Sequence, residues 1–331
     1  MEVAFSGHVP ILDASSVGDA RRTALLMAQR LGFSEKRAGD LALLTTEVSR
    51  NVLLHGQGGQ IVFSGMRSAE GPVARVLALD KGPGIPNIAE AMRDGFSTAG
   101  TMGAGMGAMK RMADNLEIFT GKNGTMVLLE VGDVSRDRDF QVAGMTLPYP
   151  GERACGDEWA MHRSEDRLLV MLVDGLGHGP EAAEAAQLAV TAFHRRADLS
   201  AGAILGHVHD SLKKTRGAVG AIAEIRPRGR VLNYCGVGNI SASILSNGAS
   251  RSMMSHNGTL GVVTSRIQEF QFEWTPGSTL ILHSDGLQTR WDLSAYPGLL
   301  NRHAGLIGGA VLRDFRRTRD DAGVVVVKAA A

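Results

Sequence analysis

The stretch LALDKGPGIP, residues Leu77–Pro86, is an apolar run that stops at an aspartate and continues with two glycines at alternate positions. A carboxylate at the end of a buried strand can point into a pocket, where it accepts hydrogen bonds from an exocyclic amine such as that of adenine. Gly82 and Gly84 have no side chains, so the backbone there can pass close to a flat ligand. The stretch therefore predicts a strand that ends at a ligand pocket, with Asp80 as the binding carboxylate.

Two further motifs accompany this stretch. Glu47 and Asn51 are four residues apart on a helix that we expect to begin after Ser34, so they share one face. A carboxylate and an amide together can hold a hydrated magnesium ion, or the carboxylate can polarise a hydroxyl group. The segment STAGTMGAGMGAMKRM places several glycines immediately before a helix, where backbone amides form an anion site. Taken separately, the Glu–Asn pair could simply face solvent and each glycine run could be a loop.

The ordered set of motifs, E-x-x-x-N, D-x-G-x-G, G-x-G-x-G and then Gly-Thr, resembles the GHKL ATPase superfamily. Over roughly residues 8–132 it is most similar to the RsbT type of anti-sigma-factor serine kinase. This resemblance implies ATP and Mg²⁺ as cofactors, with Glu47 as general base, Asn51 holding magnesium and Asp80 binding adenine. It also implies further nucleotide-binding residues, which are Gly82, Gly84, Gly103, Gly105, Gly107 and Thr125.

The second half of the chain carries acidic residues where strand-like runs meet loops. The motifs are ACGDEW, VDGLGHG, HSDGLQ and RDDAGVVVV. Strand ends hold carboxylates rigidly, and hard divalent cations prefer such oxygen ligands. Two ions bridged by these groups would activate a water and clamp a phosphate. Aspartates also commonly begin turns, which is the alternative for each motif taken singly. The candidate ligands are Asp157, Asp174, Asp285 and Asp320.

This pattern resembles the PPM family of metal-dependent serine/threonine phosphatases, in its SpoIIE/RsbX branch, over about residues 140–328. The resemblance implies a site for two Mg²⁺ or Mn²⁺ ions, bridged by Asp174 with the Gly175 carbonyl as a further ligand. Asp285 and Asp320 would complete the set, and Asp157 would bind through its carboxylate or a water. Two positions depart from the family pattern. Cys155 stands where glycine is frequent, and Gly323 replaces a serine or threonine.

Composition and order along the chain define the organisation. The chain has 331 residues, 44% of them hydrophobic, and a net charge of +1. This length accommodates two domains, and the charge balance gives no reason to propose nucleic acid or an anionic membrane as partner. Two cysteines make no disulfide framework, and we recognise neither a signal peptide nor a membrane-spanning run, so we expect a cytoplasmic protein. The charged segment GDVSRDRDF is the expected linker between domains 1–134 and 140–331.

We therefore expect an α+β protein of two domains, an N-terminal GHKL (Bergerat) α/β sandwich and a C-terminal PPM-type α-β-β-α sandwich. The first hypothesis is a bifunctional bacterial signalling enzyme, which phosphorylates and dephosphorylates a STAS-domain regulator of a stress response. A second is an ATP-sensing phosphatase without kinase turnover. A third is non-enzymatic binding of a sigma factor or another switch protein by the first domain. The sequence does not set the oligomeric state, and a homodimer is one option.

Overall fold

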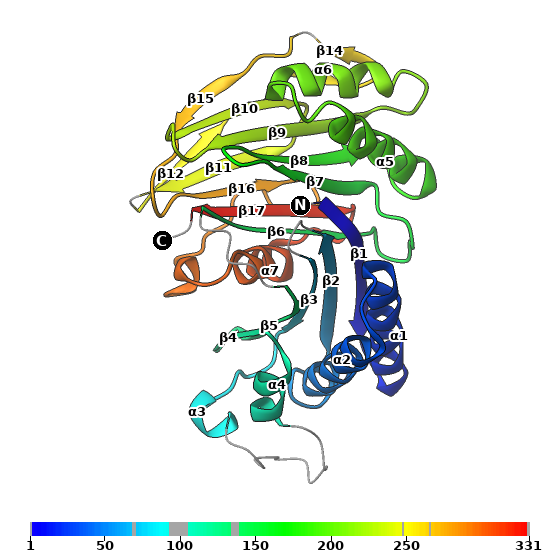
Figure 1. Ribbon diagram of the computed structural model, residues 1–331, viewed down its shortest axis with the longest axis vertical. Coiled ribbons are helices and arrows are strands. Elements are labelled where there is room, and N and C mark those ends of the chain that lie inside the picture. The colour runs from blue at the N-terminus through cyan, green and yellow to red at the C-terminus, as the bar shows by residue number, and fades with distance from the viewer. Residues whose placement is uncertain are drawn as a thin grey trace. The chain divides into compact units, whose positions relative to one another are not determined.

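The computed structural model describes residues 2–67, 71–92, 105–133, 139–246, 248–264 and 266–329. Its contacts divide the chain into two compact units, whose elements are labelled in Figure 1. The N-terminal unit comprises residues 3–136 and 296–313, and the C-terminal unit comprises residues 1–2, 137–295 and 314–331. The division differs from the expected boundaries in one important respect. Residues 296–313 lie in the second domain expected from the sequence, 140–331, but they group with the N-terminal unit.

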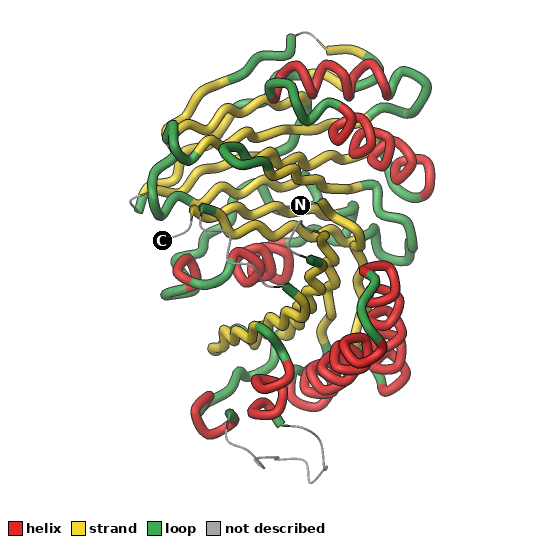
Figure 2. The backbone as a smooth tube through the Cα atoms, in the orientation of Figure 1, coloured by secondary structure: helices red, strands yellow, loops and turns green. Residues whose placement is uncertain are grey.

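The N-terminal unit is built on a five-stranded sheet with the strand order β1-β2-β3-β5-β4. The pairs β2–β3, β3–β5 and β4–β5 are antiparallel. Helices α1 and α2 pack on the sheet (Figure 2). The elements are β1 (Glu2–Ile11), α1 (Ala14–Leu31), α2 (Glu35–His55), β2 (Gly59–Arg67), β3 (Pro72–Asp80), α3 (Ile88–Ala91), α4 (Met106–Met112), β4 (Asn115–Gly121), β5 (Gly124–Gly132), η1 (Leu299–Asn301) and α7 (Ala304–Phe315).

The two long helices begin and end where the sequence predicts. Asp13 forms a capping box at the start of α1, and Gly32 closes the helix in the left-handed conformation with φ +76°. Ser34 then caps α2 by accepting a hydrogen bond from the Arg37 amide. The tight connection between the helices lets α1 and α2 lie side by side, which fixes the face of α2 that carries Glu47 and Asn51.

Strand β3 has two apolar faces. Val76 and Ala78 belong to the core shared with α1 and α2. Leu77 and Leu79 point to the opposite face, where a Cβ added to Gly309 would lie 2.8 Å from Leu77 Cδ2 and 2.9 Å from Leu79 Cδ2. Helix α7 is buried from residue 304 to residue 313. Residues 296–313 therefore cover the sheet face that α1 and α2 leave uncovered.

The C-terminal unit contains two five-stranded sheets, with strand orders β15-β10-β9-β8-β7 and β12-β11-β16-β17-β6, and the small pair β13–β14. Helices α5 and α6 pack on the first sheet. The elements are β6 (Phe140–Leu147), β7 (Asp157–Arg163), β8 (Leu168–Gly175), α5 (Pro180–Arg195), α6 (Ala201–Ser211), β9 (Ala218–Arg226), β10 (Val231–Val237), β11 (Ser241–Ser246), β12 (Ala249–Met253), β13 (Gly258–Thr259), β14 (Val263–Thr264), β15 (Phe270–Glu273), β16 (Thr279–His283) and β17 (Ala322–Ala329).

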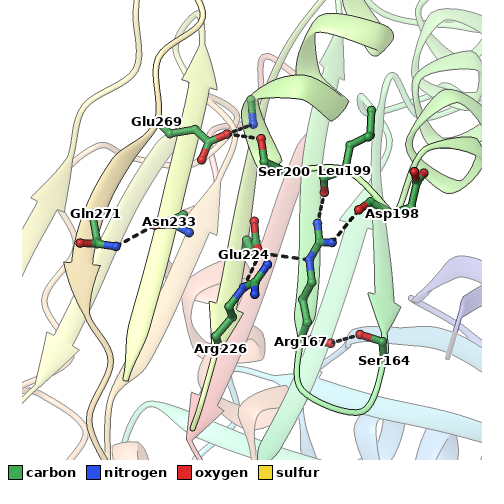
Figure 3. Close-up of polar contacts among 11 residues, drawn as sticks. Ser164, Arg167, Asp198, Leu199, Ser200, Glu224, Arg226, Asn233, Glu269 and Gln271 are labelled. Carbon is green, nitrogen blue, oxygen red and sulfur yellow. Dashed lines mark hydrogen bonds and ion pairs between the residues drawn. The ribbon is translucent and has the colours of Figure 1, made fainter. Parts of the chain in front are cut away.

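A buried charge network secures one end of the first sheet (Figure 3). Glu224, almost fully buried on β9, pairs with Arg167 Nε at 3.2 Å and Arg226 Nε at 2.8 Å. Arg167 also donates to the carbonyl of Asp198 at 3.3 Å, in the loop between α5 and α6. Two guanidiniums offset the charge of one buried carboxylate, which stabilises this end of the sheet. The acidic strand ends lie at the opposite end of β8 and β9.

Candidate active sites

Asp80 is the last residue of β3 and is 8% exposed. Its Oδ1 accepts hydrogen bonds from the amides of Gly82 and Thr125, both at 2.9 Å. These two donors orient the carboxylate at the end of the strand. Gly56, which ends α2, approaches so closely that an added Cβ would lie 2.5 Å from Asp80 Cβ. Asp80 therefore lies against the end of the helix that carries Glu47 and Asn51.

The glycines around Asp80 are required by close backbone approaches. A Cβ on Gly82 would lie 2.6 Å from the carbonyl oxygen of His55. Gly84 has φ +81°, and its Cβ would lie 2.4 Å from the carbonyl oxygen of Gly121. Gly124 has φ +110°, and a Cβ added there would lie 2.1 Å from the carbonyl oxygen of Asp80. The turn thus folds back on the β4–β5 hairpin only because side chains are missing there.

Thr125 joins this turn through its backbone and its hydroxyl. Thr125 Oγ1 lies 2.9 Å from Thr120 Oγ1, which in turn accepts a hydrogen bond from the Ile85 amide at 2.8 Å. Glu47 and Asn51 are half-buried on α2, and Glu47 Oε1 lies 3.4 Å from Arg50 Nη1. The structure thus brings the end of α2, Asp80 and Thr125 together. Gly105 precedes α4 and Gly107 lies within it, whereas Gly103 is outside the described residues.

A residue from the second half of the sequence also contacts this turn. Arg313, on α7 and 8% exposed, donates from Nη1 to the carbonyl oxygen of Asp80 at 2.9 Å. The main-chain and side-chain oxygens of Asp80 are therefore both held by donors. Sequence reasoning did not connect Arg313 with Asp80, because 233 residues separate them.

The second site begins with the pairing of β7 and β8. The antiparallel register places Asp157 directly opposite Asp174. Asp157 is 1% exposed, and the amide of Gly175 donates to the carbonyl of Gly156 at 2.9 Å, which continues the ladder beside the two carboxylates. Gly175 has no room for a side chain, since a Cβ would lie 2.2 Å from the Ala182 carbonyl oxygen. Two acidic side chains are thus fixed at one edge of the sheet.

Asp285 reaches the same site from the end of β16. Its Oδ2 accepts a hydrogen bond from Asn239 Nδ2 at 2.7 Å. The preceding residue, Ser284, donates from Oγ to Asp157 Oδ2 at 2.6 Å and accepts from the Gly323 amide at 2.9 Å. Gly323 lacks the hydroxyl of the serine or threonine that the family pattern has there. The Ser284 hydroxyl instead links the Gly323 amide to the Asp157 carboxylate.

Two consecutive aspartates precede β17. Asp320 Oδ1 accepts from the amide of Asp321 at 2.9 Å, and Asp321 Oδ1 accepts from the amide of Tyr149 at 2.7 Å. Asp321 is 1% exposed. Asp174, Asp285 and Asp320 line one cavity of ≈ 470 Å³. The other lining residues are Leu176, Gly177, Val219, Gly238, Asn239, Asn257 and Gly258.

Clustering of carboxylates raises their pKa values. Burial, followed by the charges of Asp285 and Asp320, raises the pKa of Asp174 to about 8. Burial and the neighbouring Asp174 raise the pKa of Asp157, and burial together with Asp285 raises that of Asp320. Buried like charges favour protonation, and a nearby cation would reverse this preference. The electrostatics of the cavity thus favour a positive ion.

Unsatisfied buried oxygens support the same conclusion. Asp157 Oδ1, Asp285 Oδ1 and Asp321 Oδ2 are buried and have no hydrogen-bond partner among the residues that the structure describes. Within the described ranges, no three acidic, histidine or cysteine side chains already converge as closely as a bound ion requires. The oxygen-only donor set nevertheless fits the ligand preference of a hard divalent cation. Such an ion would supply an activated water and a clamp for phosphate oxygens.

Several residues at this site were missed by the sequence analysis. Asn239, Ser284 and Asp321 each contact or adjoin a predicted ligand. The Asp-Asp pair in RDDAG was a visible signal for Asp321, whereas nothing in the local sequence indicates Asn239. His178 stacks on Tyr149 with ring centroids 4.5 Å apart, and its Nδ1 lies 3.3 Å from Glu152 Oε1.

Comparisons with known proteins identify both halves. Residues 12–131 match the histidine kinase-like ATPase domain family, and residues 164–328 match the Stage II sporulation protein E (SpoIIE) family. The serine/threonine-protein kinase RsbT of Bacillus subtilis (strain 168) is 33% identical over 110 residues, which cover 33% of this chain and 83% of RsbT. No helix in the described part of the chain is long and apolar enough to cross a membrane.

Two solved structures are similar in fold to more than half of this chain. One, from work on the bacterial stressosome as a modular system adapted to control secondary messenger signalling, is 29% identical with a TM-score of 0.54, covering 57% of this chain and 98% of its own. The other, RsbX crystallised in complex with magnesium, is 21% identical with a TM-score of 0.52, covering 65% of this chain and 100% of its own. The chain belongs to the RsbT family through its N-terminal half and joins to it a SpoIIE-type PPM serine/threonine phosphatase domain.

Proposed function

We propose that this enzyme is a two-way switch for one regulatory protein. The N-terminal unit transfers a phosphoryl group from Mg-ATP to a serine or threonine of a STAS-domain regulator, and the C-terminal unit removes it. The observation that carries the proposal is that one chain holds both the Asp80 turn at the end of α2 and a separate carboxylate-lined cavity.

In the N-terminal unit, Asp80 binds the adenine amine and Asn51 holds the magnesium ion. The glycines of the Asp80 turn and of the segment before α4 lie along the nucleotide, together with Thr125. Glu47 accepts the proton of the attacking hydroxyl as the bond to the γ-phosphorus forms and ADP leaves. This chemistry depends mainly on positioning and charge neutralisation. The common face of Glu47 and Asn51 on α2 and the contact of that helix with Asp80 support these roles.

In the C-terminal unit, Asp157, Asp174, Asp285 and Asp320, together with the Gly175 carbonyl, hold two Mg²⁺ or Mn²⁺ ions. The chemistry supplied by the ions is activation of water against the phosphoester. Water adds to phosphorus, and the serine or threonine hydroxyl leaves with a proton. The orphaned oxygens of Asp157 and Asp285 and the raised pKa of Asp174 support these assignments.

The comparisons support a regulatory protein as substrate. RsbT is a serine/threonine-protein kinase, and the solved structure that is 29% identical to this chain comes from work on the stressosome. A STAS-domain scaffold or anti-sigma antagonist is the proposed partner. Because ATP is the phosphoryl donor, we place the reaction in the cytoplasm.

The test is transfer of label from γ-labelled ATP to candidate STAS proteins. The experiment uses Asp285→Asn, in which the reverse reaction is blocked, and the matched double variant that also carries Glu47→Ala. We expect label on a STAS protein in the first and none in the second, and the wild-type C-terminal site should remove that label when Mg²⁺ or Mn²⁺ is added. Absence of label on every partner with intact ATP binding would support an ATP-sensing phosphatase instead. A stable complex with a sigma factor that is insensitive to Glu47→Ala would support non-enzymatic binding.

A further inference from the structure

Among the residues that the structure describes, the cavity lined by Asp174, Asp285 and Asp320, hereafter the metal cavity, offers no basic side chain to a phosphate. Of the described residues that line it, three are aspartates and two are asparagines, and none is basic. A phosphorylated serine or threonine carries a charge of about −1.5 to −2 at neutral pH. Because the aspartates offset the charge of the bound ions, the ions alone leave little net positive charge toward that group. A basic side chain on the cavity wall would therefore strengthen phosphate binding.

Arg216 occupies such a place. It lies in the connection between α6 and β9, where the amide of Leu176 donates to the carbonyl of Gly217 at 3.1 Å. This bond brings Arg216 alongside Leu176 and Gly177, both of which line the cavity. A Cβ added to Gly177 would lie only 2.9 Å from Arg216 Nη1. The guanidinium thus lies against the cavity wall, with its side chain 48% exposed.

Glu181 contacts one edge of this guanidinium. Glu181 Oε2, in the first turn of α5, lies 2.5 Å from Arg216 Nε. The contact uses the Nε edge of the guanidinium, whereas Nη1 lies toward Gly177. A guanidinium held on one edge presents its other donors in a fixed plane, which suits the oxygens of a phosphate. Gly177 has φ +84°, and a side chain there would crowd the guanidinium, so glycine suits this position.

We propose that Arg216 is a phosphate-binding residue of the metal cavity and that Glu181 is its positioning residue. The proposal rests on the phosphatase function proposed above. It applies to the phosphoester of the substrate and to the inorganic phosphate that is released, since both present the same oxygens. The alternative, which the experiments below test, is that the Arg216–Glu181 pair has a purely structural role.

The direct test measures binding of inorganic phosphate to the Mn²⁺-loaded full-length protein by isothermal titration calorimetry. Arg216→Gln is expected to weaken phosphate binding about tenfold, because one charge-assisted contact is lost, while its affinity for Mn²⁺ stays that of the wild type. The phosphate affinity of Arg216→Lys should lie between those of the wild type and Arg216→Gln, because lysine keeps the charge but loses the fork of donors. Wild-type phosphate affinity in Arg216→Gln would overturn the proposal.

Arg226→Gln is the matched control. Arg226 matches Arg216 in side-chain exposure, at 49%, and likewise contacts a glutamate through Nε, here the buried Glu224 at 2.8 Å (Figure 3). It lies at the other end of β9 from Val219, which lines the cavity, at a distance of about 23 Å along the strand. We expect its phosphate affinity to equal that of the wild type. An equal loss in Arg226→Gln and Arg216→Gln would show a nonspecific effect and overturn the proposal.

Hydrolysis separates this inference from the proposed function. With p-nitrophenyl phosphate and with the phosphorylated protein, Arg216→Gln should raise KM about tenfold and change kcat less. Glu181→Gln should raise KM by a smaller factor and have no effect in the Arg216→Gln background. If the wild type hydrolyses phosphoesters and Arg216→Gln has an unchanged KM, the Arg216 assignment fails and the phosphatase assignment stands. If the wild type hydrolyses no phosphoester but binds phosphate through Arg216, the phosphatase assignment fails and the Arg216 assignment stands.

Discussion

Three aspartates in this chain have the same local pattern and different surroundings. Asp80, Asp174 and Asp285 each lie at or just beyond the end of an apolar strand and precede a glycine within two residues. Asp80 is held by two backbone amides and meets the end of a helix. Asp174 and Asp285 share a cavity with Asp320, and Asp157 lies opposite Asp174. The number of acidic strand ends that the topology brings together decides whether such an aspartate suits a neutral amine or a cation.

The largest expected effect comes from Asp174, which lies between the other carboxylates. Asp174→Asn should lower phosphatase activity by at least about a hundredfold, because it would remove the proposed bridging ligand. The metal-free variant should melt no lower than the wild type, since the substitution removes a carboxyl group that burial and its acidic neighbours disfavour in its charged form. Activity assays and thermal melts with and without Mn²⁺ check both statements. A variant that keeps its activity, or loses stability without metal, would contradict the cation-site interpretation.

Asp80→Asn tests the other side of the comparison. The amide can still accept from the Gly82 and Thr125 backbone, but it presents a donor where the adenine amine needs an acceptor. We expect ATP binding to weaken by about tenfold to a hundredfold, measured with a fluorescent nucleotide. Hydrolysis of p-nitrophenyl phosphate should not change. Unaltered ATP affinity would exclude Asp80 as the adenine-binding carboxylate.

Arg313→Met tests whether the backbone of Asp80 depends on α7. Without the guanidinium, the buried Asp80 carbonyl loses its donor at 2.9 Å, which costs about 1–3 kcal/mol of unfolding free energy. ATP affinity should fall with it. Arg21→Met, at an exposed position on α1, is the control and should change neither quantity. Equal stability of the two variants would show that Arg313 does not support the turn.

A smaller effect should appear as a pH dependence of stability. Burial alone would raise the pKa of Glu130, but the charges of Arg75 and His303 and the Asn115 hydrogen bond lower it from 4.5 to about 2. The stabilisation, at most about 3 kcal/mol, is complete above pH 4.5 and is lost as the pH falls through 2. Denaturant titrations of wild type and Glu130→Gln should show a steeper loss for the wild type in this window. Parallel curves would contradict the assignment.

Local patterns predicted the two-domain α+β fold and the strands that position the acidic residues, since apolar runs and capping residues act locally. The contacts that complete the sites are not local. Ser284 reaches Asp157 across 127 residues, and Asn239 meets Asp285 across 46. Helix α7 is buried on all sides, so its pattern does not indicate which sheet it covers. Its grouping with the N-terminal unit therefore required the structure.

The most direct test of the central claim, that the chain holds two separate sites, is a crossed titration of two variants with two ligands. Mn²⁺ and ATP are each titrated calorimetrically into wild type, Asp80→Asn and Asp285→Asn, with Mg²⁺ present for ATP. We predict that Asp80→Asn loses affinity for ATP but binds Mn²⁺ like the wild type when no nucleotide is present. Asp285→Asn should lose affinity for Mn²⁺ and keep the wild-type affinity for ATP. Loss of both affinities in either properly folded variant would contradict the account.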